Sequence, residues 1–180
     1  MATFPLSLSF ISILLIITFS TNATASKLGK EETETHLHFY LHEIFNDTEP
    51  SAVLVAQGPN TSNHSTAFGA VLVIDDMLTK TPNRNSKLIG KAQGMYALSS
   101  QEDRSLLFVV NLVFLQGEFN GSSLAVLGMI PLSSPVREMP VIGGTGRFRF
   151  ARGYVLTQAY EFDVATGDSI IEYDVHVLHY

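Results

Sequence analysis

The stretch Val141–Tyr154, VIGGTGRFRFARGY, decides between two fold classes, because closely spaced glycines occur both in phosphate-binding loops and in tight turns. A dinucleotide-binding loop runs from Gly-x-Gly-x-x-Gly directly into a helix, whose N-terminus meets the pyrophosphate. Here the glycines are followed by Arg147–Phe150, RFRF, in which polar and apolar residues alternate as they do in a β-strand. No Gly-Lys-Ser/Thr follows either, which excludes a P-loop. The stretch therefore predicts a glycine turn with positive φ that leads into a strand carrying phenylalanines on one face.

The chain on both sides of this stretch continues the β pattern. Segments rich in β-branched and aromatic residues alternate with short segments rich in Gly, Pro, Asn, Ser or charged residues. Successive strands with short connections predict an all-β fold, an eight-stranded antiparallel β-barrel of the lipocalin-like kind, whose mouth can hold one small ligand. A β-sandwich is the alternative architecture. The predicted strands are His36–Phe45, Ala52–Gln57, Thr66–Ile74, Leu88–Leu98, Leu106–Leu115, Ser123–Ile130, Phe148–Phe162 and Ser169–His179.

The beginning of the 180-residue chain differs from the rest. An apolar run from Leu6 to Phe19 is followed by the small-x-small sequence Ala23-Thr24-Ala25, which is typical of a cleaved secretory signal peptide. The run is shorter than the roughly 20 residues that a membrane-spanning helix needs. We therefore predict a signal peptide over 1–25, a polar linker over 26–35 and a single barrel domain over 36–180, with no membrane segment in the mature protein.

Composition and short motifs indicate how the fold is held together, which partner is excluded and where the protein is found. The chain contains no cysteine, so packing, hydrogen bonding and oligomerisation must hold the fold without disulfides. A net charge of −6 argues against nucleic acid as a partner. Asn-x-Ser/Thr sequons predict glycosylation of an extracellular protein at Asn46, Asn60, Asn63 and Asn120.

The segment THLHFYLHEIF places histidines and an acid on opposite faces of one predicted strand. His36, His38, Tyr40 and His42 share one face, and two histidines at i and i+2 are a possible start of a metal site. Because the sequence pairs them with no further ligand, we expect no metal and a histidine row that is solvated or faces another subunit. Glu43 interrupts the apolar face, where burial would raise its pKa and suit it to proton transfer. A carboxylate at the barrel end that simply reaches water is the alternative.

Two further residues are candidates for contacting a ligand. Arg137 precedes the glycine turn and is able to bind a ligand oxygen, or else to form a structural pair with Glu138 or Glu118. Tyr96 is the aromatic candidate for holding a phenolic ligand, with core packing as the alternative.

Asp75 and Asp76 stand where a predicted strand gives way to a turn, and we interpret both as turn caps. The sequence has no serine nucleophile elbow, zinc-protease helix or haem motif. We therefore expect no cofactor and no redox chemistry from the chain itself.

Taken together, the segments resemble the dirigent protein family of plants over essentially the whole mature chain. Each string is short, but their joint occurrence in this order is specific. The strings are HLHFYLHEI (36–44), FGAVLVIDDMLT (68–79), GKAQGMYALSS (90–100), FLQGEFNGSSLAVLG (114–128), VREMPVIGGTGRFRFARGY (136–154) and IEYDVHVLHY (171–180).

The resemblance implies an eight-stranded barrel similar to allene oxide cyclase, secreted to the apoplast, glycosylated, and assembled as a homodimer or homotrimer. It implies partners that are phenolic small molecules, in particular coniferyl alcohol radicals that an external laccase or peroxidase makes and the protein couples stereoselectively into lignans. Holding two reactants in one orientation is enough to direct such coupling. On this hypothesis Glu43 and Arg137 act in catalysis, and Tyr96, His36 and Tyr40 bind the substrate.

Three positions depart from the lignan-forming pattern of the family. Glu43 stands where Asp is usual, Ile130 replaces a second pocket Asp, and Ala159 replaces a Thr. These features resemble the branch that includes pterocarpan synthases, which dehydrate an isoflavanol through a quinone methide. An isoflavanol dehydratase is therefore one alternative function, and a non-catalytic binder of phenolics during cell-wall lignification is another.

Overall fold

The computed structural model describes residues 31–180, so the predicted signal peptide over 1–25 lies outside the described residues. Within this range no helix has the length and apolar character needed to cross a membrane. Three short 3₁₀ turns, η1 (Thr61–Asn63), η2 (Gly117–Phe119) and η3 (Gly146–Phe148), accompany the strands. The strands are β1 (Thr33–Glu43), β2 (Ala52–Ala56), β3 (Val71–Thr79), β4 (Leu88–Leu98), β5 (Ser105–Phe114), β6 (Ser123–Pro131), β7 (Val136–Thr145), β8 (Arg152–Phe162) and β9 (Ser169–His179).

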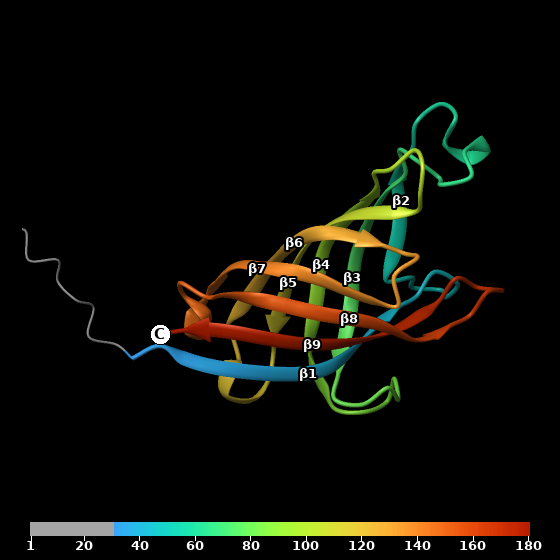
Figure 1. Ribbon diagram of the computed structural model, residues 1–180. Helices are drawn as coiled ribbons and strands as arrows, with labels where there is room; N and C mark the ends of the chain where they lie inside the picture. The colour runs from blue at the N-terminus through green and yellow to red at the C-terminus, as the bar shows by residue number, and fades with distance from the viewer. Residues whose placement is uncertain (1–30) are drawn as a thin grey trace, which may run out of the picture. The chain divides into compact units, whose positions relative to one another are not determined.

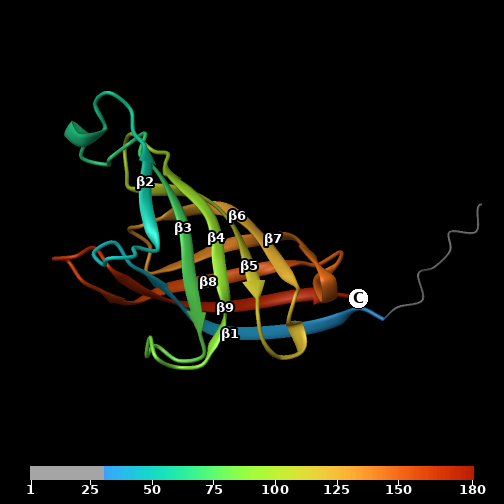
Figure 2. The ribbon, with the colours of Figure 1, turned by 180° about the vertical axis from the view of Figure 1, so that it is seen from behind.

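The strands form one antiparallel sheet that closes on itself, which confirms the predicted all-β, eight-stranded antiparallel barrel. The order is β1-β9-β8-β7-β6-β5-β4-β3, and β1 completes the barrel by pairing its residues Tyr40–His42 with Met77–Thr79 of β3. The remaining strand, β2, pairs only with β3. Figures 1 and 2 show β2 and the loop that follows it standing out from one end of the barrel.

The eight strands of the barrel are not the eight that the sequence predicts. The prediction includes β2, which lies outside the barrel, and misses β7, whose segment looks like a loop because it contains prolines. Pro140 is accommodated because the first half of β7 pairs with β8, while pairing with β6 begins only at Val141. A proline fits a strand where no partner needs its missing N–H.

Two strands, β1 and β3, extend beyond their predicted bounds by more than a single residue. β1 begins at Thr33, inside the predicted linker, because Thr33 pairs with His179 at the far end of β9. β3 continues through Asp75 and Asp76 to Thr79, because all these residues pair with β4. Pairing with neighbouring strands therefore outweighs the polar composition of both segments.

The glycine stretch is correctly predicted as a turn but wrongly predicted as a strand. Gly146 has φ of +61°, as expected for the turn. Arg147–Phe150, however, does not alternate across a sheet: Phe148 lies in η3 and is fully buried, whereas Phe150 has φ of +63° and is 66% exposed. Phe148 packs against Phe119 with ring centroids 4.7 Å apart, so the turn closes the barrel end with an aromatic cluster.

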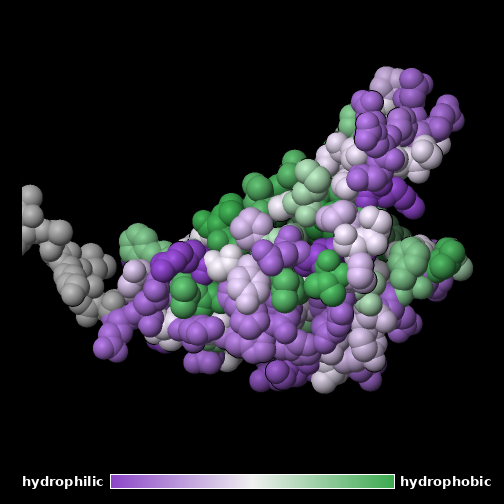
Figure 3. Space-filling view, viewed as in Figure 1, coloured by the Kyte–Doolittle hydropathy of each residue, from purple (hydrophilic) through white to green (hydrophobic). Residues whose placement is uncertain are grey.

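The outer surface of the barrel has an apolar part and a polar part. Figure 3 shows apolar residues gathered along the upper edge of the molecule near β6, above a hydrophilic region over β9 and β1. The four predicted glycosylation sites are all exposed. The exposed apolar side chains on β2 to β6 are Val53, Leu54, Val55, Val73, Met95, Leu107, Val109, Leu127 and Met129.

Candidate functional site

One pocket lies inside the barrel, and side chains from most of its strands converge on it. Its cavity volume is about 50 Å³, and it is partly open to solvent. Apolar side chains form most of the wall, and a small number of polar groups project into it. The lining residues are Leu41, Glu43, Asp76, Phe108, Ile130, Leu132, Arg137, Thr157, Ile171 and Tyr173.

Glu43 lies at the last position of β1, with its carboxyl group in this pocket. Ser169, its cross-strand partner on β9, donates a hydrogen bond of 3.3 Å from Oγ to Glu43 Oε2. Burial raises the pKa of Glu43, and the nearby Tyr96 and Ser169 hydroxyls only partly oppose this effect. The predicted environment of Glu43 is thus present, and its role in proton transfer stays a prediction.

Asp76 is a second pocket carboxyl, and our interpretation of it as a turn cap is wrong. It lies inside β3 and is completely buried. Ser51 donates a hydrogen bond of 2.5 Å from its Oγ to Asp76 Oδ1, but Oδ2 has no hydrogen-bond partner among residues 31–180. Burial, with a smaller contribution from the Glu43 charge, raises the pKa of Asp76 to about 8. Asp76 is therefore protonated at neutral pH.

The sequence does contain a signal for this position. In VLVIDDMLT, the alternation of a strand places Asp76 on the same face as Leu72, Ile74 and Leu78, all of which are buried. Asp75 points outward, where its carboxylate binds Lys91 Nζ at 2.7 Å and Gln93 Nε2 at 2.9 Å. Because the predicted strand ends at Ile74, it does not include Asp76, and the alternation that places Asp76 inside the barrel is not recognised.

Arg137, Thr157 and Tyr173 stand side by side on β7, β8 and β9, in register with one another. The Arg137 guanidinium donates to the main-chain carbonyls of Pro131 at 3.3 Å and Leu132 at 3.2 Å. None of the ion pairs found among residues 31–180 includes Arg137, so the expected alternative of a structural pair with Glu138 or Glu118 is not seen. Burial lowers its pKa, and a guanidinium so placed remains charged.

The other predicted substrate-binding residues lie elsewhere. Tyr96 does not line the pocket; its ring stacks on Phe108, which does, with centroids 6.3 Å apart. His36 and Tyr40 lie on the outer face of β1, opposite the inward-facing Phe39 and Leu41, so we correct their expected place in the pocket. The Tyr40 hydroxyl donates to Glu172 at 3.3 Å on that outer face.

The structure shows where Ile130 and Ala159, two of the positions that depart from the lignan-forming pattern, lie relative to the pocket. Ile130 lines the pocket, so an apolar side chain stands where an acid was expected. Ala159 is exposed, and the threonine of the pocket is instead Thr157, two residues earlier on β8. The acid missing at position 130 has a counterpart on another strand, because Asp76 supplies a second carboxyl to the same pocket.

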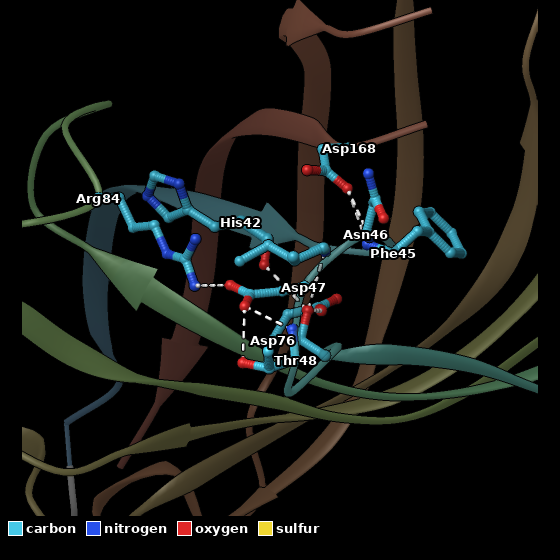
Figure 4. A network of polar contacts seen from close by, with 10 residues as sticks. His42, Phe45, Asn46, Asp47, Thr48, Asp76, Arg84 and Asp168 are labelled. Atoms are coloured by element: carbon cyan, nitrogen blue, oxygen red, sulfur yellow. Dashed lines mark hydrogen bonds and ion pairs between the residues drawn. The ribbon is translucent and has the colours of Figure 1, made fainter. Parts of the chain in front are cut away.

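Glu43 also borders a larger and more open depression at the barrel end, with a cavity volume of about 210 Å³, whose lining includes His42, Arg84 and Asp168. Figure 4 shows how polar contacts hold the loop after β1 at this end. Asp168 Oδ1 accepts hydrogen bonds from the main-chain N–H groups of Phe45 and Asn46, at 2.8 and 3.3 Å. His42, expected in a solvated row, is instead buried and bonded to Thr79 Oγ1 at 2.7 Å. Glu43 therefore borders two hollows, the pocket inside the barrel and this depression at its end.

The raised pKa of Asp76 predicts how the stability of the protein depends on pH. The unfolded chain releases this proton near pH 3.8, whereas the folded protein keeps it to about pH 8. Between these values a rise in pH favours the unfolded state, which has already lost the proton. We expect the free energy of unfolding of the wild type to fall, relative to that of Asp76→Asn, by on the order of a few kcal/mol as pH rises from about 5 to about 8.

Urea denaturation of both proteins at several pH values measures this difference. Glu43 also has a raised pKa and is present in both proteins, so the difference between them reports Asp76 together with its coupling to Glu43. Parallel stability curves for the two proteins would contradict a protonated Asp76.

Comparison with known sequences gives one consistent result. A family model described as Dirigent-like protein matches residues 34–178. The chain is 45% identical over 177 residues to pterocarpan synthase 1 of Glycine max, covering 97% of this chain and 95% of that protein. It is 48% identical over 162 residues to Dirigent protein 21 of Arabidopsis thaliana, covering 89% of this chain and 86% of that protein.

Comparison with solved structures agrees. A pterocarpan synthase dirigent protein superposes with a TM-score of 0.80 at 49% sequence identity, covering 84% of this chain and 93% of that one.

Proposed function

We propose that this chain, which belongs to the dirigent protein family, catalyses acid-assisted loss of water from a phenolic alcohol of the isoflavanol class through a quinone methide. The observation that carries the proposal is the Asp76 carboxyl, protonated at neutral pH and with one oxygen lacking a partner, in the same pocket as Glu43. Two carboxyls whose environments differ are suited to separate acid and base roles.

In the first step Asp76 is the general acid. Its carboxyl proton passes to the benzylic hydroxyl of the substrate, the C–O bond breaks and water leaves. The phenolic O–H of the substrate gives its proton to the Glu43 carboxylate, and the product of the step is a neutral quinone methide. Proton transfer by a positioned side chain contributes about 10²–10⁴ to a rate.

In the second step a hydroxyl group of the same molecule adds to the quinone methide and closes a ring. The proton of this hydroxyl passes to the Asp76 carboxylate, and Glu43 returns its proton to the phenolate oxygen, so the net change is the loss of one water. The Arg137 guanidinium supports the oxygen on which negative charge develops, and the apolar wall holds the ring system in one orientation.

A second candidate function is stereoselective coupling of phenoxy radicals, such as those of coniferyl alcohol, with the radicals supplied by an external laccase or peroxidase. Its support is the similarity to relatives named as dirigent proteins. This function uses the same pocket for orientation and the same acids for the later cyclisation, but it requires an oxidant that the first function does not.

The two functions separate in one experiment with the secreted protein. Incubation with an isoflavanol and no oxidant should give the dehydrated, ring-closed product, measured by chiral chromatography. A parallel incubation uses coniferyl alcohol with laccase, beside a laccase-only control. Enantiomeric excess only in the second reaction would replace the dehydratase proposal with radical coupling. No product in the first and a racemic product in the second would favour the non-catalytic binder of phenolics.

The proposal also includes the oligomeric state of the protein and its location. The exposed apolar side chains on the outer face of β3 to β6 suit an interface between copies of this chain, as a homodimer or homotrimer, because exposed apolar side chains gathered on one face are typical of interaction sites. Light scattering on the purified protein measures the subunit number. Secretion to the apoplast and glycosylation at the four exposed sequons fit the chemistry of a wall phenolic pathway.

A further inference from the structure

Three side chains lie together on the polar outer face of the barrel, and their proximity could not be predicted from the sequence. His36 on β1 is the direct cross-strand partner of His176 on β9, and Asp174 lies two residues before His176 on the same face. One ligand atom from each of the three residues lies within 4.8 Å of the others. All three side chains are partly exposed, so the cluster is accessible to solvent.

We propose that His36, Asp174 and His176 form a binding site for a divalent transition-metal ion, Zn²⁺ or Cu²⁺. The site lies on the outside of the barrel, is separate from the pocket of Glu43 and Asp76, and does not depend on the function proposed for that pocket. This proposal reverses our expectation that the chain binds no metal, which rested on the lack of a visible third ligand in the sequence.

The spacing of the donor atoms supports the proposal. Asp174 Oδ1 lies 2.5 Å from His36 Nε2 and 3.1 Å from His176 Nε2, so both nitrogens face one carboxylate oxygen. Ligands at about 2.0–2.2 Å from a tetrahedral ion are about 3.4 Å apart. Small rotations of the side chains are therefore enough to reach coordination geometry.

The surroundings of the site restrict its movement. The His36 and His176 rings stack with centroids 4.6 Å apart, and Tyr154 of β8 stacks on His176 with centroids 4.9 Å apart. All of these residues project from paired strands rather than loops. A site whose ligands are already held in place loses little conformational entropy when the ion binds.

The donor set selects the kind of ion. Two imidazoles and one carboxylate suit Zn²⁺ and Cu²⁺, whereas Mg²⁺ and Ca²⁺ prefer oxygen ligands alone. Three protein ligands leave coordination positions for water, so the bound ion would exchange with the medium. The net charge of −6 favours the approach of cations in general.

Isothermal titration of the untagged, secreted protein with zinc chloride and, separately, with copper(II) chloride tests the proposal. We expect one ion per chain. His176→Gln or Asp174→Asn should weaken binding by at least the roughly 10- to 100-fold that is typical for the loss of a residue that only supports a metal ligand. His38→Gln is the matched control, because His38 lies on the same face of β1 but its Nε2 binds Glu172 at 2.7 Å instead. The control should keep wild-type affinity.

Electron paramagnetic resonance of the copper-loaded protein gives a second readout that folding defects do not imitate. Two nitrogen ligands should appear in the wild type and one in His176→Gln. Absence of binding to both ions, binding that the two variants leave unchanged, or loss of binding only in His38→Gln would each overturn the proposal.

Discussion

Replacement of Asp76 by Asn should lower the rate of product formation by about 100-fold or more, which is the contribution expected of a general acid. The amide is close to the carboxyl in size and is able to accept the Ser51 hydrogen bond, but it has no proton to give to a leaving hydroxyl. Because Asp76 is completely buried, keeping its shape matters as much as removing its acidity. Single-turnover assays with the isoflavanol measure the effect on the chemical step itself.

Asp75→Asn is the matched control for this experiment. It changes the neighbouring residue of the same strand from acid to amide, but on the outer face, where Asp75 binds Lys91 and Gln93. Its rate should remain that of the wild type. Glu43→Gln should reduce the rate through the loss of the base, and also change product stereochemistry. A fully active Asp76→Asn would remove Asp76 from the mechanism, and retention of full rate and enantiomeric excess by Glu43→Gln would remove Glu43.

Replacement of Phe148 by Ala should have the largest effect on stability, a loss of about 3–5 kcal/mol in the free energy of unfolding. Phe148 is fully buried, and its ring packs against Phe119 at 4.7 Å, Phe114 at 5.5 Å and His179 at 5.1 Å between centroids. The alanine would leave a cavity at the closed end of the barrel that these rings, fixed on separate elements, fill only in part. Urea denaturation monitored by circular dichroism gives the free energy.

Phe150→Ala provides the control two residues further along the same stretch. Phe150 is 66% exposed, and alanine and phenylalanine both carry a Cβ at this positive φ and are similarly strained, so we expect a change within about 0.5 kcal/mol. The predicted strand would place both phenylalanines on one face and make the two substitutions similar in cost. Equal losses for the two variants would therefore contradict the 3₁₀ turn at Gly146–Phe148.

The candidate site could be predicted from the sequence only in part. Glu43 is recognisable because a single acid interrupts an apolar face of a strand, and Arg137 because it precedes a glycine turn; both line the pocket. Asp76 was missed because two adjacent acids look like the end of a strand, although one of them faces inward. His36 and Tyr40 were assigned to substrate binding although they lie on the face of the strand that we expected to be solvated or to face another subunit, and the structure places them on the outside.

The sequence by itself determined the all-β class, the bounds of β4 and β9 and the turn at Gly146, because alternation and glycine φ preferences act between residues close together in the chain. Tertiary structure alone decided that β7 enters the barrel and β2 does not, since this depends on which strands meet. The tertiary structure also determined which polar side chains lie together in the two clusters. Glu43 meets Asp76, and His36 meets Asp174 and His176, only because closure of the barrel pairs β1 with β3 on one side and β9 on the other. Contacts between residues that lie tens to more than a hundred positions apart leave no periodic trace in a single sequence.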